Sequence, residues 1–221
     1  MNNKHLAFGI LIGGKSTRFG VDKGLFKLRK KRLIEYQLEI LQYFNFDIFL
    51  IANDKTQVQS YIDEIDFHII TGFIIDEYDF GLDPTIRSPM IGLYSAFKEL
   101  RKLNYKKLYA LSCDNPLIKK EVVNFLIQEI KEYECVVPRW KNQFVEPLFA
   151  IYPIEKAYYR SSECIKKHQF KLTNIIDKEW KIKFISIEKT IRKLDPYLLS
   201  FKNINTNGDI EEIEKIFKNN N

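Results

Sequence analysis

The sequence predicts an α/β fold built on a mainly parallel sheet with helices on both faces. Short apolar runs alternate with amphipathic stretches along the 221 residues, which is the pattern of βαβ units. Several of these runs end directly in Gly, Asn or Asp residues, as buried strands do where they reach a loop. The composition, 45% hydrophobic and 29% charged, is that of a globular chain and excludes disorder for the bulk of it.

The first elements are expected in regular alternation. Residues 6–12 form a continuous apolar run, which predicts a buried strand, and apolar residues at helical spacing predict a helix over 33–44. A second apolar run at 48–52 predicts a strand, followed by a helix over 55–65. Residues 67–75 are β-branched and aromatic, which favours a third strand.

The alternation continues through the middle of the chain. Residues 90–103 carry apolar side chains on one helical face, and 108–112 form the next buried strand. A helix is expected over 119–133, followed by strands at 134–137 and 148–152.

Two elements close the chain, a strand at 182–187 with alternating hydrophobicity and a helix over 209–217. This order implies right-handed βαβ crossovers. Because ligands bind at the carboxyl ends of the strands of such sheets, the loops after the first, second and central strands are the expected place for chemistry.

The charge balance is modestly basic, with 35 Lys and Arg against 29 Asp and Glu and a formal net charge of +6. Much of the excess lies in the run 27–32, which is either a solvated turn or a basic rim that attracts phosphate-bearing ligands. Nucleic-acid binding is the weaker interpretation, since the sequence has no zinc-finger, RRM or KH signature.

Membrane insertion and secretion are not expected. No apolar run approaches the roughly 18 residues of a membrane helix. Residues 4–12 resemble the start of a signal peptide, but no cleavage site follows, and Lys15 and Arg18 come directly after. The three cysteines are too few and too scattered for a disulfide framework, so we expect a reducing, cytoplasmic location.

A polar loop, GGKSTRFGVDK, follows the first expected strand at 13–23. Gly13 and Gly14 allow the backbone to approach a ligand closely, so that successive amides can bind phosphate oxygens. Arg18 adds a planar set of donors and Lys23 a compact positive charge. The loop is neither a Walker A motif nor GxGxxG. It predicts phosphate binding, and the alternative is an ordinary glycine turn.

A carboxylate, Asp114, follows the expected central strand at 108–112. A buried strand end is a costly place for a charge without a partner. A divalent cation is the natural partner, because Mg²⁺ takes oxygen ligands and bridges to substrate phosphates. The alternative is a helix N-cap. The neighbouring Cys113 is interpreted as a packing residue.

Residues 11–23, LIGGKSTRFGVDK, resemble the LAGGxSxRMGxDK signature of the molybdenum cofactor guanylyltransferase (MobA-like) family of nucleotidyltransferases. Four later segments resemble motifs of the same family in the same order: RSPMIGL at 87–93, CDNP at 113–116, VEPLFAIY at 145–152 and FKNINT at 201–206. The resemblance runs from Leu6 to about Ile216. It implies one Rossmann-like domain of the nucleotide-diphospho-sugar-transferase type over 1–221.

The activity that this resemblance implies is transfer of GMP from GTP to the phosphate of molybdenum-bearing molybdopterin, with release of pyrophosphate. Asp114 would hold Mg²⁺, and Arg18 and Lys23 would neutralise charge on the triphosphate. An acceptor phosphate is already nucleophilic at neutral pH, so positioning and charge stabilisation suffice without a general base. Molybdoenzyme-maturation proteins are the further partners that the family suggests, and the oligomeric state stays open.

The resemblance also implies a set of contact residues. Asn53 and Asp76 would both contact the nucleotide. By itself Asn53 indicates only a turn, and Asp76 has acidic neighbours. Asn203 and Asn205 are expected on the acceptor side, and their equal parity on a strand would point both amides to one face. The implied nucleotide contacts are Leu11, Ile12, Gly13, Gly14, Lys23, Asn53, Asp76 and Asp114.

The chain departs from the family pattern at several positions. Ile12 replaces a small Ala beside the expected place of the base, Asn115 replaces a Met, and residues 207–208 replace Pro-Glu. The base therefore stays open between guanine and cytosine. A related enzyme with another phosphate-bearing acceptor, a silent nucleotide-binding relative and, from charge alone, a nucleic-acid-binding protein are the alternatives.

Overall fold

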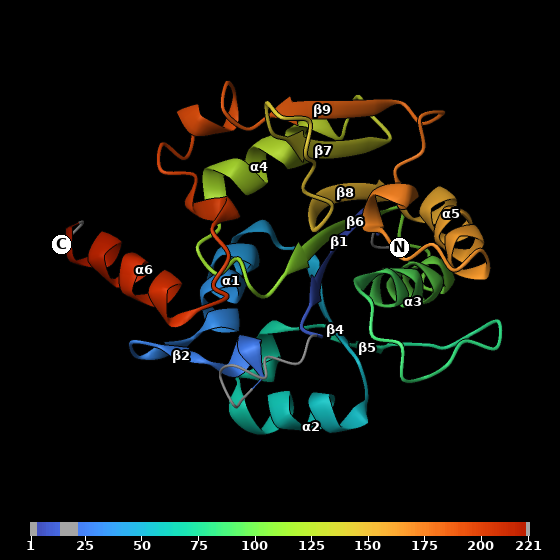
Figure 1. Cartoon of the computed structure of the whole chain (residues 1–221), viewed down its shortest axis with the longest axis horizontal. Coiled ribbons are helices and arrows are strands. Elements are labelled where there is room, and N and C mark those ends of the chain that lie inside the picture. The colour runs from blue at the N-terminus through green and yellow to red at the C-terminus, as the bar shows by residue number, and fades with distance from the viewer. Residues whose placement is uncertain (1–3, 14–21, 220–221) are drawn as a thin grey trace.

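The structure, a computed structural model, describes residues 4–13 and 22–219. A seven-stranded sheet lies at its centre, in the order β5-β4-β1-β6-β8-β7-β9 (Figure 1). The strands are β1 (Leu6–Leu11), β4 (Asp47–Ala52), β5 (Gly72–Ile75), β6 (Lys107–Ser112), β7 (Cys135–Arg139), β8 (Phe149–Pro153) and β9 (Ile182–Ser186).

The sheet is parallel apart from one strand. β1 pairs in parallel with both β4 and β6, β4 with β5, and β7 with β9, whereas β8 runs antiparallel to its neighbours β6 and β7. The predicted α/β class with a mainly parallel sheet is therefore confirmed. Leu11 pairs with Ile51 on one side and with Ser112 on the other, so the loops that follow β1, β4 and β6 begin side by side.

Helices cover both faces of the sheet. Their bounds are α1 (Leu33–Leu41), α2 (Lys55–Glu64), α3 (Pro89–Lys102), α4 (Lys120–Glu129), α5 (Ile154–Lys166) and α6 (Asn207–Asn219). Apolar residues of α1, α2 and α4 share one core cluster with Phe8 and Ile10 of β1. Those of α3 and α5 pack with Ala7 and Leu11 on the other face. Alternate residues of β1 thus serve opposite faces, as a doubly covered strand requires.

The C-terminal helix α6 lies beside α1 rather than on the main sheet (Figure 1). Its Ile213 is fully buried in a third cluster that includes Leu28 and Leu33. Leu28 belongs to a hairpin of β2 (Lys27–Leu28) and β3 (Lys31–Arg32), which carries the basic run. Ion pairs inside the protein partly neutralise this run, because Lys31 lies 2.6 Å from Glu39 and Arg32 pairs with Glu64.

Several elements differ from the sequence prediction. Only Gly72–Ile75 of the expected strand at 67–75 forms a strand, since Phe67–Ile69 forms a 3-10 turn that Asp66 caps. Helix α5 was not predicted at all. The segment around Asn203 and Asn205 was expected to be a strand and is irregular, so the equal-parity argument for their amides was wrong. Within the described ranges, no helix is both long and apolar enough to cross a membrane.

Candidate functional site

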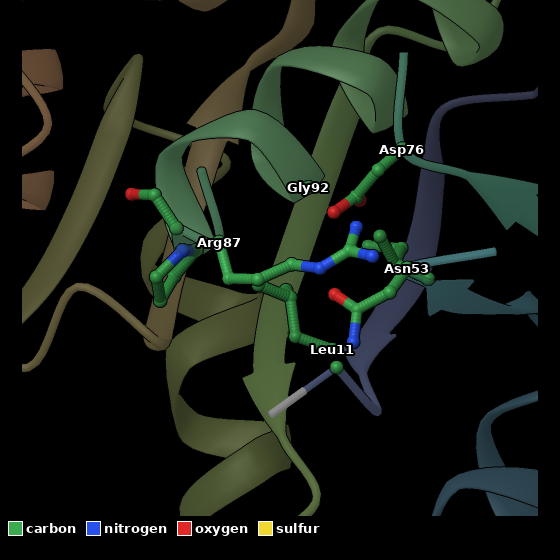
Figure 2. Close-up of a pocket in the computed structure, with 9 residues that line it drawn as sticks. Leu11, Asn53, Asp76, Arg87 and Gly92 are labelled. Atoms are coloured by element: carbon green, nitrogen blue, oxygen red, sulfur yellow. The ribbon is translucent and has the colours of Figure 1, made fainter. Parts of the chain in front are cut away.

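A pocket opens where β1, β4 and β5 end against the first turn of α3 (Figure 2). Its cavity volume of about 110 Å³ lies below the range of about 300–1,000 Å³ that is typical of sites for whole small molecules, so the pocket can enclose only part of a ligand. The described residues that line this nucleotide-side pocket are Leu11, Gly13, Ile51, Asn53, Asp76, Arg87, Ser88, Pro89 and Gly92.

The start of α3 closes one wall of the pocket. The Ser88 hydroxyl caps the helix by accepting from the Met90 amide at 3.2 Å, and Pro89 occupies the first turn. Gly92 lets the helix approach the strand ends, since an added Cβ would lie 3.3 Å from Oδ1 of Asp76 and from Cγ2 of Ile51. A larger residue would therefore push α3 away from the pocket.

Asn53 lies directly over the end of β1. A Cβ added to Gly13 would meet Oδ1 of Asn53 at 2.5 Å, so this position needs a glycine while Asn53 holds its place. The next residue, Asp54, is the one that caps α2, by accepting from the Gln57 amide at 3.0 Å. Because Asp54 makes the capping bond, the side-chain amide of Asn53 is left to face the pocket (Figure 2).

Asp76 follows β5 and contributes a partly buried carboxylate to the same pocket. Burial raises the pKa of Asp76 from 3.8 to about 7; the nearby Arg87 opposes this shift and Asp54 adds to it. Figure 2 shows the Arg87 guanidinium between the Asp76 carboxylate and the Asn53 amide. A carboxyl group that titrates near neutrality inside a pocket is a usual mark of a functional site.

A second group of polar residues gathers at the end of β6. Nζ of Lys23 lies 3.3 Å from Oδ2 of Asp114 and 2.6 Å from Oδ1 of Asn205. The Ile204 amide also donates to the Asp114 carbonyl at 2.9 Å. Helix α4 begins at Lys120 with Lys119 as its N-cap, so Asp114 is not a helix cap. Three residues predicted from separate motifs thus meet in one place, which we call the Lys23–Asp114–Asn205 cluster.

The start of α6 orients Asn205. The Asp209 carboxylate accepts from the amides of Asn205 at 2.8 Å and Thr206 at 2.7 Å, and from the Thr206 hydroxyl at 2.9 Å. These backbone hydrogen bonds lower the pKa of Asp209. Asn203, the other predicted amide, accepts from the side chain of Asn115, next to Asp114. A capping arrangement therefore places Asn205, and the bond to Asn115 places Asn203.

Gln57 and Tyr61 hold the residue before Lys23, and sequence reasoning missed both. Tyr61 donates to Oδ1 of Asp22 at 2.5 Å, and burial keeps the pKa of this phenol well above its usual value, so it stays a donor. The side-chain nitrogen of Gln57 donates to Asp22 and, at 2.9 Å, to the Ile12 carbonyl. Its side-chain oxygen accepts from the backbone amide of Asn53 at 2.8 Å. The only sequence signal was their spacing on one face of a helix.

Gln37 and Glu146 also support the cluster and were not predicted. Gln37 is fully buried and donates to the carbonyls of Ser112 at 2.8 Å and Asn115 at 2.7 Å, which fixes the turn that carries Asp114. Glu146 accepts from the Trp140 indole at 2.5 Å. Burial and the charge of Asp114 raise the pKa of Glu146, whereas the Trp140 bond lowers it. A second carboxyl group therefore lies within electrostatic reach of Asp114.

The remaining predicted residues have different outcomes. Gly14 and Arg18 lie outside the described residues. The Ile12 side chain is fully buried in the core cluster, so only its backbone faces the loop region. Leu11 and Gly13 line the pocket as the resemblance implied.

The Lys23–Asp114–Asn205 cluster has the donor chemistry that Mg²⁺ requires. It offers a carboxylate oxygen and an amide oxygen, both hard ligands. No group of three or more His, Cys, Asp or Glu residues suited to a metal exists among residues 4–13 and 22–219. Mg²⁺ does not need one, because it usually binds through one or two carboxylates plus substrate phosphates and water.

The fold and the two adjoining groups of residues define a nucleotidyltransferase. The sequence profile of the MobA-like NTP transferase domain matches residues 9–177. The chain therefore belongs to the MobA-like NTP transferase family, as the loop signature predicted.

Similar proteins share most of the chain's length. A probable molybdenum cofactor guanylyltransferase from Carboxydothermus hydrogenoformans is 31% identical, over 97% of this chain and 98% of its own. One from Pyrococcus horikoshii is 30% identical, over 94% and 98%.

Solved structures agree with this assignment. The molybdopterin-guanine dinucleotide biosynthesis protein A of Archaeoglobus fulgidus aligns with a TM-score of 0.74 at 26% identity, over 96% of this chain and 99% of that one. The 4-diphosphocytidyl-2C-methyl-D-erythritol synthase of Anaerococcus prevotii aligns with a TM-score of 0.65 at 13% identity, over 98% and 97%, and shows the shared fold alone.

Proposed function

We propose that this protein transfers GMP from GTP to the terminal phosphate of molybdopterin that carries molybdenum, and so forms the guanine dinucleotide cofactor. The observation that carries this proposal is the Lys23–Asp114–Asn205 cluster beside a pocket at the strand ends. The names of the relatives supply the base and the acceptor. We place the reaction in the cytoplasm and expect molybdoenzyme-maturation proteins to receive the product.

The chemical step is a displacement at phosphorus. An acceptor phosphate oxygen attacks the α-phosphorus of GTP, a phosphoanhydride bond forms, and the bond to the β-phosphate breaks to release pyrophosphate. The acceptor oxygen is already anionic at neutral pH, so no side chain has to remove a proton from it. Catalysis then depends on positioning and on positive charge near the triphosphate.

Lys23 and Asp114 divide the charge stabilisation in this proposal. The Lys23 ammonium, which contacts Asn205 and Asp114, would bind the phosphates. Asp114 would hold Mg²⁺, with Asn205 close enough to supply an amide oxygen. When bound, the ion neutralises charge on the reacting phosphates. Arg18 belongs to the same proposal as a second cationic donor to the triphosphate.

A pyrophosphate-release assay tests the proposal. The whole protein is supplied with Mg²⁺, molybdopterin in its molybdenum-bearing form, and each of the four NTPs in turn. We expect release with GTP only, and its loss when the acceptor is omitted. Release with CTP instead would contradict the choice of guanine, and silence with all four NTPs from folded protein that binds nucleotide would contradict the enzymatic reading.

A further inference from the structure

One cationic side chain at the nucleotide-side pocket has no part in the chemistry described above. Arg87 immediately precedes the cap of α3, and its guanidinium projects across the pocket between Asp76 and Asn53 (Figure 2). Among the described residues that line this pocket, Arg87 is the one that carries a positive charge. It lies on the pocket side of the site, whereas Lys23 contacts Asp114 and Asn205.

Two loops hold the Arg87 side chain in this position. Nη1 donates to the Tyr78 hydroxyl at 2.5 Å, and Nη2 lies 3.8 Å from Oδ2 of Asp54. The guanidinium carbon is 5.9 Å from the centre of the Tyr78 ring. A guanidinium has five N–H donors, and the bond to Tyr78 uses one of them. The side chain keeps 43% of its surface exposed, so a ligand that enters the pocket can reach it.

The walls of the pocket do not discriminate between bases. Leu11, Ile51 and Pro89 offer apolar surface, which binds any planar ring to a similar degree. Selection has to come from polar groups that meet the base edge, because a mismatched base leaves such groups buried and unpaired. Ser88 accepts from the Met90 amide as the cap of α3, which fixes its oxygen there and leaves its hydroxyl hydrogen to donate. Asp76 and Arg87 then present an acceptor and a donor side by side (Figure 2).

This pair matches one edge of guanine. Guanine carries two donors, the N1 and N2 hydrogens, beside the acceptor O6; a carboxylate accepts from the donors, and an arginine donates to O6. Adenine and cytosine present an amino donor beside a ring-nitrogen acceptor, which reverses both contacts. We propose that Arg87 is a specificity-determining residue that recognises O6 of guanine while Asp76 accepts from N1 and N2. This inference rests on the proposed use of GTP.

The experiment compares the wild type and three variants with two nucleotide analogues. In 6-thio-GTP, sulfur replaces O6 and accepts hydrogen bonds poorly, while N1–H and the 2-amino group remain. Inosine triphosphate lacks only the 2-amino group. Each nucleotide is compared with GTP in kcat/KM for pyrophosphate release and in Kd by calorimetry. The proteins are the wild type, Arg87→Met, Arg87→Lys and, as a matched control, Arg101→Met at the far end of α3.

The wild type should prefer GTP to 6-thio-GTP about 10- to 100-fold, the range of a hydrogen bond to a charged group. Arg87→Met should lose most of this preference and keep the wild-type penalty for inosine triphosphate. Arg87→Lys should recover part of the preference, and Arg101→Met should behave as the wild type. An unchanged preference for GTP over 6-thio-GTP in Arg87→Met would overturn the inference.

The Kd measurements separate this inference from the proposed function. If the wild type binds GTP with an Arg87-dependent preference but releases no pyrophosphate, the inference stands and the proposed reaction fails. If the wild type turns over GTP and Arg87→Met retains full selectivity, the reaction stands and the inference fails. If the wild type binds all four NTPs equally in calorimetry, Arg87 recognises no base, and the inference fails.

Discussion

The ammonium group of Lys23 lies 3.3 Å from the carboxylate of Asp114, although 91 positions separate the two residues. One follows the loop after β1 and the other the end of β6, and the parallel pairing of these two strands brings them together. Lys23 thus forms an ion pair with the carboxylate that we propose as the Mg²⁺ ligand. In the proposed reaction, the phosphates of the nucleotide would contact Lys23 and Mg²⁺ would contact Asp114, and these contacts would replace the ion pair.

Replacement of Asp114 by Ala should abolish most of the activity. The expected loss is at least ~2–4 kcal/mol in the activation barrier, which is the scale of removing a main electrostatic stabiliser. Initial rates of pyrophosphate release at saturating Mg²⁺ measure this loss, and circular dichroism confirms that the variant is folded. Turnover close to that of the wild type would show that Asp114 does not hold the metal.

Replacement of Lys23 by Ala should weaken the use of nucleotide strongly. The variant lacks a charge-assisted contact to phosphate, worth about 1.5–3 kcal/mol, and leaves Asp114 without its cationic neighbour. Steady-state kinetics over a range of GTP concentrations measures the effect as a fall in kcat/KM. An unchanged kinetic profile would refute the assignment of Lys23 to the triphosphate.

Replacement of Gln57 by Leu should raise the KM for GTP although Gln57 touches neither Lys23 nor Asp114 in the structure. The variant loses the hydrogen bonds of the Gln57 side chain to Ile12, Asp22 and Asn53. Since these bonds hold the backbone of Asn53 and the residue before Lys23, both Asn53 and Lys23 should be positioned less well. The matched control is Gln59→Leu on the exposed face of α2, where Gln59 bonds only to Asp63 among the described residues. Equal kinetics for the two variants would contradict a positioning role for Gln57.

The contribution of Asp76 to protein stability should fall as pH rises from about 4 to about 7, because the pKa of this carboxyl group is raised from 3.8 to about 7 in the folded protein. In that window the native state retains a proton that the unfolded chain releases. Complete ionisation would then cost up to about 4 kcal/mol, at about 1.36 kcal/mol per pKa unit. Arg87 and Asp54 are the charged groups that face Asp76, and they act in opposite directions.

Urea unfolding of the wild type and Asp76→Asn measures this effect. The variant should gain stability over the wild type at pH 8 and show little difference at pH 4.5. A constant difference between the two proteins across this range would contradict the raised pKa. The same carboxylate is the acceptor proposed for guanine, so binding of GTP to the wild type should strengthen as pH rises through about 7.

Much of the site was predictable because ligands of α/β sheets bind at the carboxyl ends of the strands. Polar residues placed directly after apolar runs, as Asn53 and Asp114 are, lie at the carboxyl edge of a parallel sheet wherever the helices between them pack. The loop signature then located Lys23 with its order and spacing. Such features depend on local sequence and on the topology that the alternation implies.

The supporting residues were not predictable by the same route. Gln37 and Gln57 act through bonds to backbone atoms far away in sequence, and any amphipathic helix carries similar glutamines on its flanks. Arg87 belongs to a segment whose path depends on tertiary contacts with Tyr78 and Asp54. Helix α5 was missed because its polar central stretch, YRSSE at 159–163, obscures the apolar periodicity of Ile154, Ala157 and Ile165.

Transfer of label from GTP to the acceptor tests the central claim most directly. The protein is incubated with Mg²⁺, molybdenum-bearing molybdopterin and GTP labelled at either the α- or the γ-phosphate, and the pterin product is isolated. The account predicts that the α-label appears in a guanine dinucleotide and that the γ-label leaves in pyrophosphate. The γ-label in the pterin product, or no label in it from protein that binds GTP, would contradict nucleotidyl transfer.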